Sequence, residues 1–132
     1  METFYSIREQ KKVEPLSYQE LKKWSDTFDV MGNPIRLAIV VILYGNSVLL
    51  EGKHELTFGQ IMSIVKAPSK PALASHLHEL IEFGLIDKRP VKDDKNRVYP
   101  IYVLSAKGKD FLIDFGLKEF IEKRIADTEL HR

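Results

Sequence analysis

The segment SKPALASHLHELIEFGL, residues 69–85, decides the fold that the sequence predicts. Ser69 is a favourable helix N-cap residue, and Pro71 is tolerated in a first turn. Apolar side chains then recur at helical spacing, at Leu73, Leu77, Leu80 and Ile81. Gly84 suits the position just past a helix C-terminus. The segment therefore predicts a helix from Lys70 to about Phe83 with one apolar face.

A charged β-hairpin is predicted directly after this helix. Two short strands, from Leu85 to about Pro90 and from Val98 to about Leu104, flank the turn VKDDKNR of residues 91–97. Aspartate and asparagine in this turn favour the chain reversal. Pro100 lacks a backbone N–H, which predicts an edge position for the second strand.

Three helices are predicted before residue 69. The first runs from the capping box at Ser17–Glu20 to about Met31, with Leu21, Trp24, Phe28 and Met31 on one face. Asn33 and Pro34 start the second, which extends to about Tyr44 and is apolar on almost every side, as expected of a core helix. Thr57 caps the third, from Phe58 to about Val65. Residues 45–55 are less clearly patterned: residues 47–50 favour either an extension of the second helix or a short strand, and residues 52–54 favour a turn.

The C-terminal segment predicts a final helix that begins at Ala106, after the N-cap residue Ser105. Gly116 either kinks this helix or divides it. Its apolar side chains are Phe111, Leu112, Phe115, Phe120, Ile121 and Ile125.

This order of elements predicts a mainly α, α+β fold, namely a winged helix-turn-helix with a three-helix core. We expect residues 1–15 to form an N-terminal arm and residues 16–105 to form the winged helix-turn-helix domain. Residues 106–132 are expected to form a C-terminal dimerisation helix.

The composition excludes several classes of function. The chain has 132 residues and a formal net charge of +1, so it suits one domain without a global basic field. It contains no cysteine, which excludes disulfides, thiol catalysis and cysteine-ligated zinc. Charges interrupt every apolar run before membrane-spanning length, so we expect a cytoplasmic protein with no membrane partner.

No pattern in the sequence indicates an enzyme. It lacks a glycine-rich phosphate loop, a nucleophile elbow and metal-ligand spacing. His76 and His78 point about 200° apart on a helix, so they cannot share an ion. We expect no catalytic residue, no metal and no cofactor.

Four segments in series resemble the ArsR-type winged-helix regulators. Residues 33–37 (NPIRL) resemble the opening of that fold, residues 69–80 its recognition helix and residues 84–86 (GLI) its exit into the wing. Residues 104–108 (LSAKG) resemble the start of the final helix in related regulators of the MarR and PadR types. The resemblance implies a DNA-binding transcription factor that is a homodimer. The cysteine pair of the metal-sensing members is missing here, and the resemblance does not identify an effector.

The predicted DNA-binding residues are small, polar or cationic side chains on the recognition helix, before it and on the hairpin. Short polar and cationic groups at a helix N-terminus suit the major groove, and a charged hairpin tip suits phosphates or the minor groove. The predicted set is Thr57, Ser69, Lys70, Pro71, Ala72, Ser75, His76, His78, Lys88, Arg89, Lys92, Lys95 and Arg97. The predicted dimer interface is Trp24, Phe28, Phe111, Phe115, Phe120 and Ile121.

Alternatives remain for several of these residues. Ordinary surface or interface positions are the alternative for His76 and His78, and the motif favours DNA contact for His76 but not for His78. The mixed charges of the hairpin are also typical of a solvated loop, although the preceding helix favours DNA contact. Arg36 either pairs with an acid or contacts phosphate. We interpret the chain as a homodimeric, sequence-specific repressor that binds double-stranded DNA. A protein-interaction module and a low-specificity architectural DNA-binding protein are the alternatives.

Overall fold

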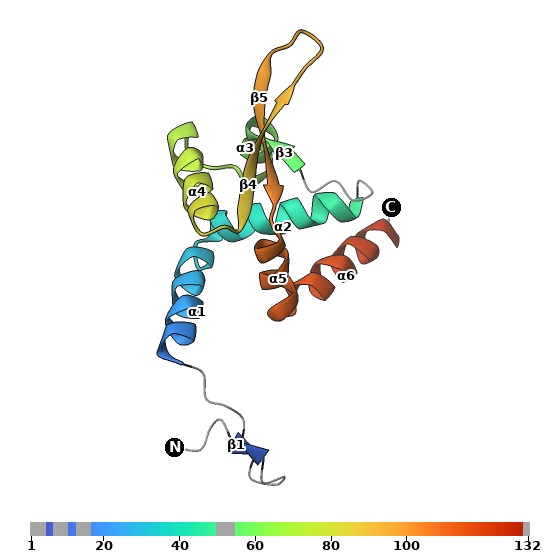
Figure 1. The fold of residues 1–132 in the computed structure, drawn as a ribbon. Coiled ribbons are helices and arrows are strands. Elements are labelled where there is room, and N and C mark those ends of the chain that lie inside the picture. Colours follow the sequence, from blue (N-terminus) through green and yellow to red (C-terminus); the bar gives the residue numbers. More distant parts are fainter. Residues whose placement is uncertain (1–4, 7–10, 13–16, 50–54, 131–132) are drawn as a thin grey trace.

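The computed structural model describes residues 5–6, 11–12, 17–49 and 55–130, and it confirms the predicted α+β class (Figure 1). A short antiparallel pair, β1 and β2, lies in the expected N-terminal arm. The other elements are six helices and three strands. Their bounds are β1 Tyr5–Ser6, β2 Lys11–Lys12, α1 Tyr18–Met31, α2 Pro34–Leu49, β3 Glu55–Thr57, α3 Phe58–Val65, α4 Lys70–Glu82, β4 Ile86–Lys92, β5 Val98–Leu104, α5 Ala106–Asp114 and α6 Leu117–Leu130.

Helix α2 is the central element of the core, as its apolar sequence predicted. Ile39, Val40 and Leu43 are fully buried, and α1, α3, α4, α5 and α6 all contact this helix. Each such side chain contributes about 1.5–3 kcal/mol by leaving water. Helices α3 and α4 therefore pack against α2 in a fixed position. Ile61 of α3 and Leu73 of α4 are also fully buried in this core.

The junction between α1 and α2 forms as the sequence predicted. The Asn33 side chain accepts hydrogen bonds from the backbone N–H groups of Ile35 (2.9 Å) and Arg36 (3.1 Å), and Pro34 occupies the first helical position. In the described residues no single helix is long and apolar enough to span a membrane. Helices α1 and α2 reach that length only as a pair, which is bent by 91°.

Helix α4 ends in a Schellman motif that leads directly into β4. Gly84 has φ +73°, the Leu85 N–H donates to the Leu80 carbonyl (3.0 Å) and the Gly84 N–H donates to the Ile81 carbonyl (2.9 Å). Leu85 is fully buried. Because the chain reverses within two residues, the direction of β4 is tied to the end of α4.

The sheet has a third strand that the sequence analysis missed, because β3 is only three residues long. The order is β3-β5-β4, so β5 is central and its predicted edge position is wrong. Pro100 is nevertheless tolerated, because β3 reaches only as far as Thr57, opposite Ile101. Beyond this point only β4 faces β5, and Pro100 lies opposite Pro90, where neither nitrogen can donate.

Two helices differ from their expected lengths. Helix α2 continues beyond Tyr44 to Leu49, which settles the first part of the open segment, while residues 50–54 lie outside the described chain. The final segment is divided into α5 and α6 at Gly116, which has φ +72°.

The capping box predicted at the start of α1 forms only in part. The Ser17 hydroxyl accepts from the Glu20 N–H, as predicted, but the Glu20 carboxylate accepts from the Ser17 hydroxyl instead of from the Ser17 backbone N–H.

A polar contact joins the returning helix α6 to α2. The Tyr44 hydroxyl donates to the Glu122 carboxylate, which also lies 3.5 Å from the Lys118 ammonium. Burial, and then the nearby carboxylate, raise the pKa of Tyr44 to about 12. The same hydrogen bond lowers the pKa of Glu122. Tyr44 therefore remains a donor, and Glu122 an acceptor, at neutral pH.

Two helical glycines give a test of the packing between α5 and the end of α4. A Cβ atom at Gly108 would lie 2.2 Å from the Leu85 carbonyl oxygen, whereas one at Gly59 meets nothing within 4 Å. We expect Gly108→Ala to lower the free energy of unfolding by about 3 kcal/mol through overpacking. Gly59→Ala should raise it by about 0.5–1 kcal/mol through helix propensity. Urea denaturation measures both, and equal effects would contradict this packing.

Candidate nucleic-acid interface

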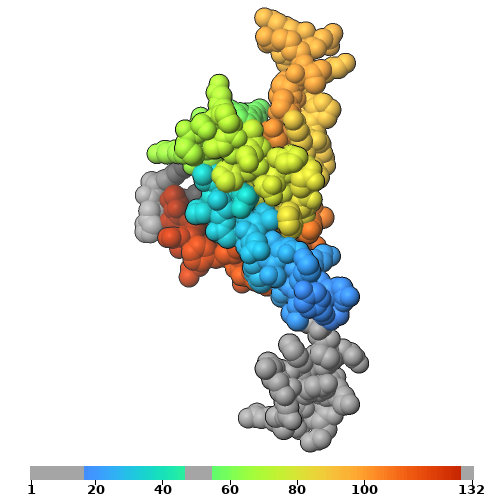
Figure 2. Space-filling view, turned by 90° about the vertical axis from the view of Figure 1, so that its left-hand side faces the viewer, coloured from blue at the N-terminus to red at the C-terminus, as the bar shows by residue number. Residues whose placement is uncertain are grey.

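The N-terminal end of α4 and the wing, defined as β4, β5 and the turn between them, lie on the same side of the molecule. In Figure 1 the start of α4 (green) and the tip of the wing (orange) both point upwards. Figure 2, viewed from the α4 side, shows the wing projecting well beyond the body, with α4 across the face beside it. A helix end and a projecting hairpin therefore form one continuous surface.

Burial of one side of α4 determines which residues the helix presents to solvent. Leu73, Leu77 and Leu80 are buried in the core. The exposed residues of α4 up to residue 78 are Lys70, Pro71, Ala74, Ser75 and His78. Residues 69–78 contain no acidic side chain, so the exposed first half of α4 carries only cationic, polar and small groups.

The N-termini of α3 and α4 are both capped by residues of the predicted set. The Ser69 hydroxyl accepts from the Ala72 N–H at 3.2 Å. Thr57 and Gln60 form a complete capping box, with bonds of 3.2 and 2.8 Å. Ala72 itself is only half exposed. Both caps fix the direction of helix ends that carry partial positive charge.

The two histidines of α4 occupy different environments. His76 is half buried, and its Nδ1 is buried without a hydrogen-bond partner in the described structure. Burial, and then the nearby Arg36 guanidinium, hold the pKa of His76 below its usual value. His78 is exposed and lies 3.8 Å from the Glu82 carboxylate. In the structure the His78 side chain is exposed, whereas the His76 side chain is half buried.

Arg36 makes a contact that neither sequence interpretation foresaw. Its Nε donates to the Val30 carbonyl at 2.8 Å, and the side chain is half buried. The bond joins the start of α2 to the end of α1. Arg36 thus stabilises the α1–α2 junction, and its positive charge lies near His76.

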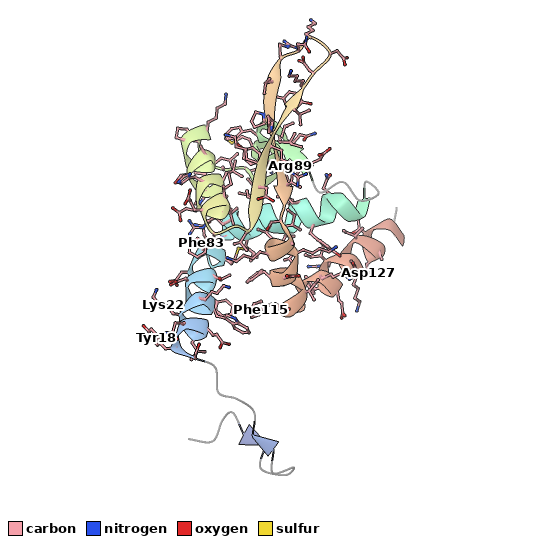
Figure 3. All side chains as sticks on the ribbon, in the orientation of Figure 1. Tyr18, Lys22, Phe83, Arg89, Phe115 and Asp127 are labelled. Carbon is pink, nitrogen blue, oxygen red and sulfur yellow. The ribbon has the colours of Figure 1, made fainter. Side chains whose placement is uncertain are left out.

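Strand register divides the wing cations between two faces. Lys88 and Lys92 share a face with Ile86, which is fully buried against the core, because residues two apart point to the same side. Arg89 projects from the other face of β4 (Figure 3). Its partner on β5 is Ile101. Lys88 and Lys92 therefore project into solvent from the same side of the sheet that faces the core nearer its base.

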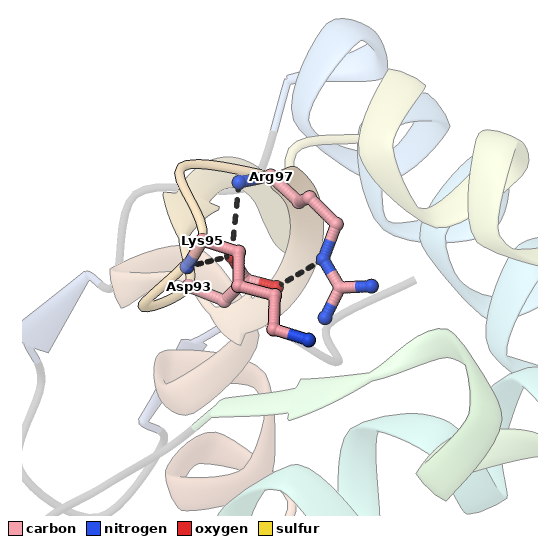
Figure 4. Close-up of polar contacts among 3 residues, drawn as sticks. All are labelled: Asp93, Lys95 and Arg97. Atoms are coloured by element: carbon pink, nitrogen blue, oxygen red, sulfur yellow. Dashed lines mark hydrogen bonds and ion pairs between the residues drawn. The ribbon is translucent and has the colours of Figure 1, made fainter.

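The turn of the wing is organised by Asp93, one of the residues that the sequence analysis expected to favour the chain reversal (Figure 4). Its carboxylate accepts from the backbone N–H groups of Lys95 (2.8 Å) and Arg97 (2.9 Å), and from Arg97 Nε (2.7 Å). These bonds, that of the Arg97 backbone first, lower the pKa of Asp93. Asn96 completes the turn with φ +61°. Aspartate three residues before asparagine in a hairpin was the available signal.

An exposed aromatic surface lies between α1 and the α5–α6 corner, remote from the wing (Figure 3). The Phe115 ring centroid is 5.7 Å from that of Trp24, 4.9 Å from that of Phe28 and 5.0 Å from that of Phe111. Phe120 is 58% exposed. Of the predicted dimer residues, Phe111 and Ile121 are buried in the core of this chain, which leaves the other four exposed. In the described ranges no group of three or more acidic or histidine side chains is placed to hold a metal ion.

The Asp93 network predicts a specific response of the wing turn to substitution. In Asp93→Ala the amides of Lys95 and Arg97 lose their acceptor, so we expect their hydrogen exchange to rise about tenfold. Asp94→Ala is the matched control, since Asp94 is exposed and adjacent. Amide exchange measured by NMR distinguishes the two variants. Unchanged exchange in Asp93→Ala would show that the turn is held by other contacts.

Comparison with known proteins supports the fold. No protein-family model matches the chain, and no curated protein sequence matches it significantly. The structure is similar to the reduced form of the transcriptional regulator YodB from B. subtilis, with TM-score 0.55 and 20% identity over 77% of this chain and 86% of that one. It is also similar to a transcriptional regulator homologue from Pyrococcus horikoshii OT3, with TM-score 0.56 and 24% identity over 83% of this chain and 96% of that one. The chain has the winged-helix fold of these regulators.

Proposed function

We propose that this protein is a sequence-specific, double-stranded DNA-binding transcriptional regulator that acts as a homodimer. The observation that carries this proposal is the shared direction of the α4 N-terminus and the wing, with Lys70 on one and Lys92 and Arg97 on the other. The winged-helix fold that the chain shares with two transcriptional regulators supports it. The near-neutral net charge is compatible with it because residues 69–78 carry no acidic side chain and the wing carries five cationic side chains against three acidic ones.

The DNA contact follows from the exposed groups. Residues 70–78 of α4 enter the major groove, where Ser75 and His78 face base edges and Lys70 faces a phosphate or guanine. The capped N-terminus at Ser69 approaches a phosphate. Arg97, oriented by Asp93, approaches the backbone or the minor groove. Glu79 and Glu82 occupy the second half of α4, which points away from the DNA-binding end.

The homodimer accounts for the exposed apolar side chains that the DNA contact leaves unused. Leu21, Trp24 and Phe28 on α1 and Phe115 and Phe120 around the α5–α6 corner are all at least two-fifths exposed. A second copy related by two-fold symmetry buries this surface and presents two recognition helices to successive turns of DNA. Repression by occupancy of the operator needs no surface besides these two.

Selection of binding sites from fragmented host genomic DNA, with footprinting at near-physiological salt, tests the function. We expect a short inverted repeat with half-sites about one helical turn apart. Equal binding to any sequence would indicate an architectural DNA-binding protein. Absence of DNA binding would favour a protein-interaction module.

Charge reversal tests the surface itself. We expect Lys70→Glu, Lys92→Glu and Arg97→Glu each to weaken DNA binding by about tenfold or more, because each removes a phosphate contact and adds repulsion. Lys109→Glu on α5 is the charge-matched control, and it should bind DNA about as tightly as the parent protein. Fluorescence anisotropy with the selected DNA measures the affinities. Equal losses in all four variants would remove the assignment of this surface.

Substitution of Phe120 tests the dimer. Among the described aromatic and cation–π contacts, the Phe120 ring contacts only Arg124 of the same helix, whose guanidinium carbon lies 5.4 Å from the ring centroid. Phe120→Asp should raise the dimer dissociation constant by about tenfold or more, because symmetry places the change in the interface twice. Ile64→Asp, at an equally exposed apolar residue on α3, is the control and should leave dimerisation intact. Sedimentation equilibrium at micromolar concentration decides between them. A monomeric parent protein would contradict the homodimer.

A further inference from the structure

Two apolar side chains, those of Pro71 and Ala74, lie on the exposed face of α4 among groups that can form hydrogen bonds. Both are exposed, as are Ser75 and His78 further along the helix. The spacing of these four residues is i, i+3, i+4 and i+7, so they share one face of α4. The face therefore presents an apolar pair, Pro71 and Ala74, followed by a polar pair.

The core of the protein does not use this apolar pair. The buried core of the described residues, and the partly buried apolar side chains packed against it, include neither Pro71 nor Ala74. The buried leucines Leu73 and Leu77 occupy the other side of the helix. Both members of the pair lie towards the end of α4 that points the same way as the wing (Figure 1). Their apolar surface is therefore free to contact whatever binds there.

An apolar surface in the major groove has one matching group among the bases. Every base pair presents hydrogen-bond donors and acceptors in this groove, and thymine alone adds a C5-methyl group. An apolar side chain placed against a donor or acceptor buries that polar group without a partner, which costs free energy. Placed against the methyl group, it removes apolar surface from water on both sides. The apolar pair is therefore complementary to thymine.

We propose that Pro71 and Ala74 contact the C5-methyl group of thymine and so determine part of the DNA sequence that the protein selects. This inference rests on the proposed function, in which residues 70–78 of α4 enter the major groove. Three residues of a helix advance about 4.5 Å, and successive nucleotides of one DNA strand are about 3.4 Å apart. The pair therefore covers one thymine or two adjacent thymines in each half-site.

The wing cannot produce this specificity. The C5-methyl group lies in the major groove, whereas the minor groove presents the same acceptors for A·T and T·A pairs. Arg97 approaches the backbone or the minor groove in the proposed complex, where no methyl group is displayed. A dependence of affinity on the thymine methyl group is therefore evidence about α4, separate from the wing.

Replacement of thymine by deoxyuridine in the selected DNA removes the methyl group and keeps the donors and acceptors of the base pair. Fluorescence anisotropy with the full-length protein measures the affinity for duplexes that carry one replacement at a time. We expect a loss of about fourfold at one position or two adjacent positions of a half-site, from the lost burial of one methyl group. At such a position, a pair with 5-methylcytosine should bind about fourfold more tightly than a pair with cytosine, because the methyl group is restored.

A matched pair of variants assigns the methyl contact to α4. Ala74→Ser adds a hydroxyl group to the apolar pair, whereas Ala126→Ser makes the same substitution at an exposed position of α6. We expect the fourfold deoxyuridine penalty to disappear in Ala74→Ser and to remain in Ala126→Ser. Pro71→Ser should reduce the penalty as well. Each penalty is a ratio of two affinities of one variant, so an overall loss of affinity does not imitate the result.

The outcomes separate this inference from the function on which it rests. Equal affinity for thymine and deoxyuridine at every position, with sequence-specific binding intact, would overturn the methyl contact and leave the proposed function standing. A penalty that persists in both Ala74→Ser and Pro71→Ser would overturn the assignment to these residues. Failure of the proposed function would show differently, as a lack of sequence-specific binding even to the unmodified DNA, and the inference would fall with it.

Discussion

The burial of Leu73, Leu77 and Leu80 in the core around α2 is the constraint on which the proposed function depends. These three side chains occupy one side of α4, so Lys70, Ser75 and His78 are on the side that remains in solvent. Each leucine contributes about 1.5–3 kcal/mol to this placement. A helix held in this way presents its polar groups in one orientation, so little conformational entropy would be lost in the proposed complex with DNA.

The wing is held by local bonds where the core does not reach. The Ile86–Leu104 pair anchors its base, and the Asp93 carboxylate organises its tip through three hydrogen bonds. Because the pKa of Asp93 is lowered, its carboxylate remains ionised throughout the neutral range, and the turn loses this support only as pH falls through that lowered pKa. The Arg97 side chain is thereby oriented in the free protein. A protein with a net charge of +1 can still form a cationic surface of this kind, because the position of the cations matters more than their number.

The sequence predicted the elements that have strong local signals. The caps Asn33, Thr57 and Ser69, the apolar spacing of α4 and the glycine after it gave the correct helices and the hairpin. The short strand β3 was missed because its three residues carry no periodicity, and the edge position of Pro100 was inferred without knowledge of where β3 ends. The orientation of His76 and the burial of Phe111 and Ile121 depend on tertiary contacts, which spacing alone does not specify.

The most direct test of the account is the map of amide chemical-shift changes when isotopically labelled protein is titrated with its selected DNA. We expect the largest changes in residues 69–78 and in the wing residues 91–98, with α6 unaffected except through the dimer. A map centred on α1 and α6, with α4 and the wing unchanged, would contradict the claim that the α4 N-terminus and the wing form the DNA-binding surface.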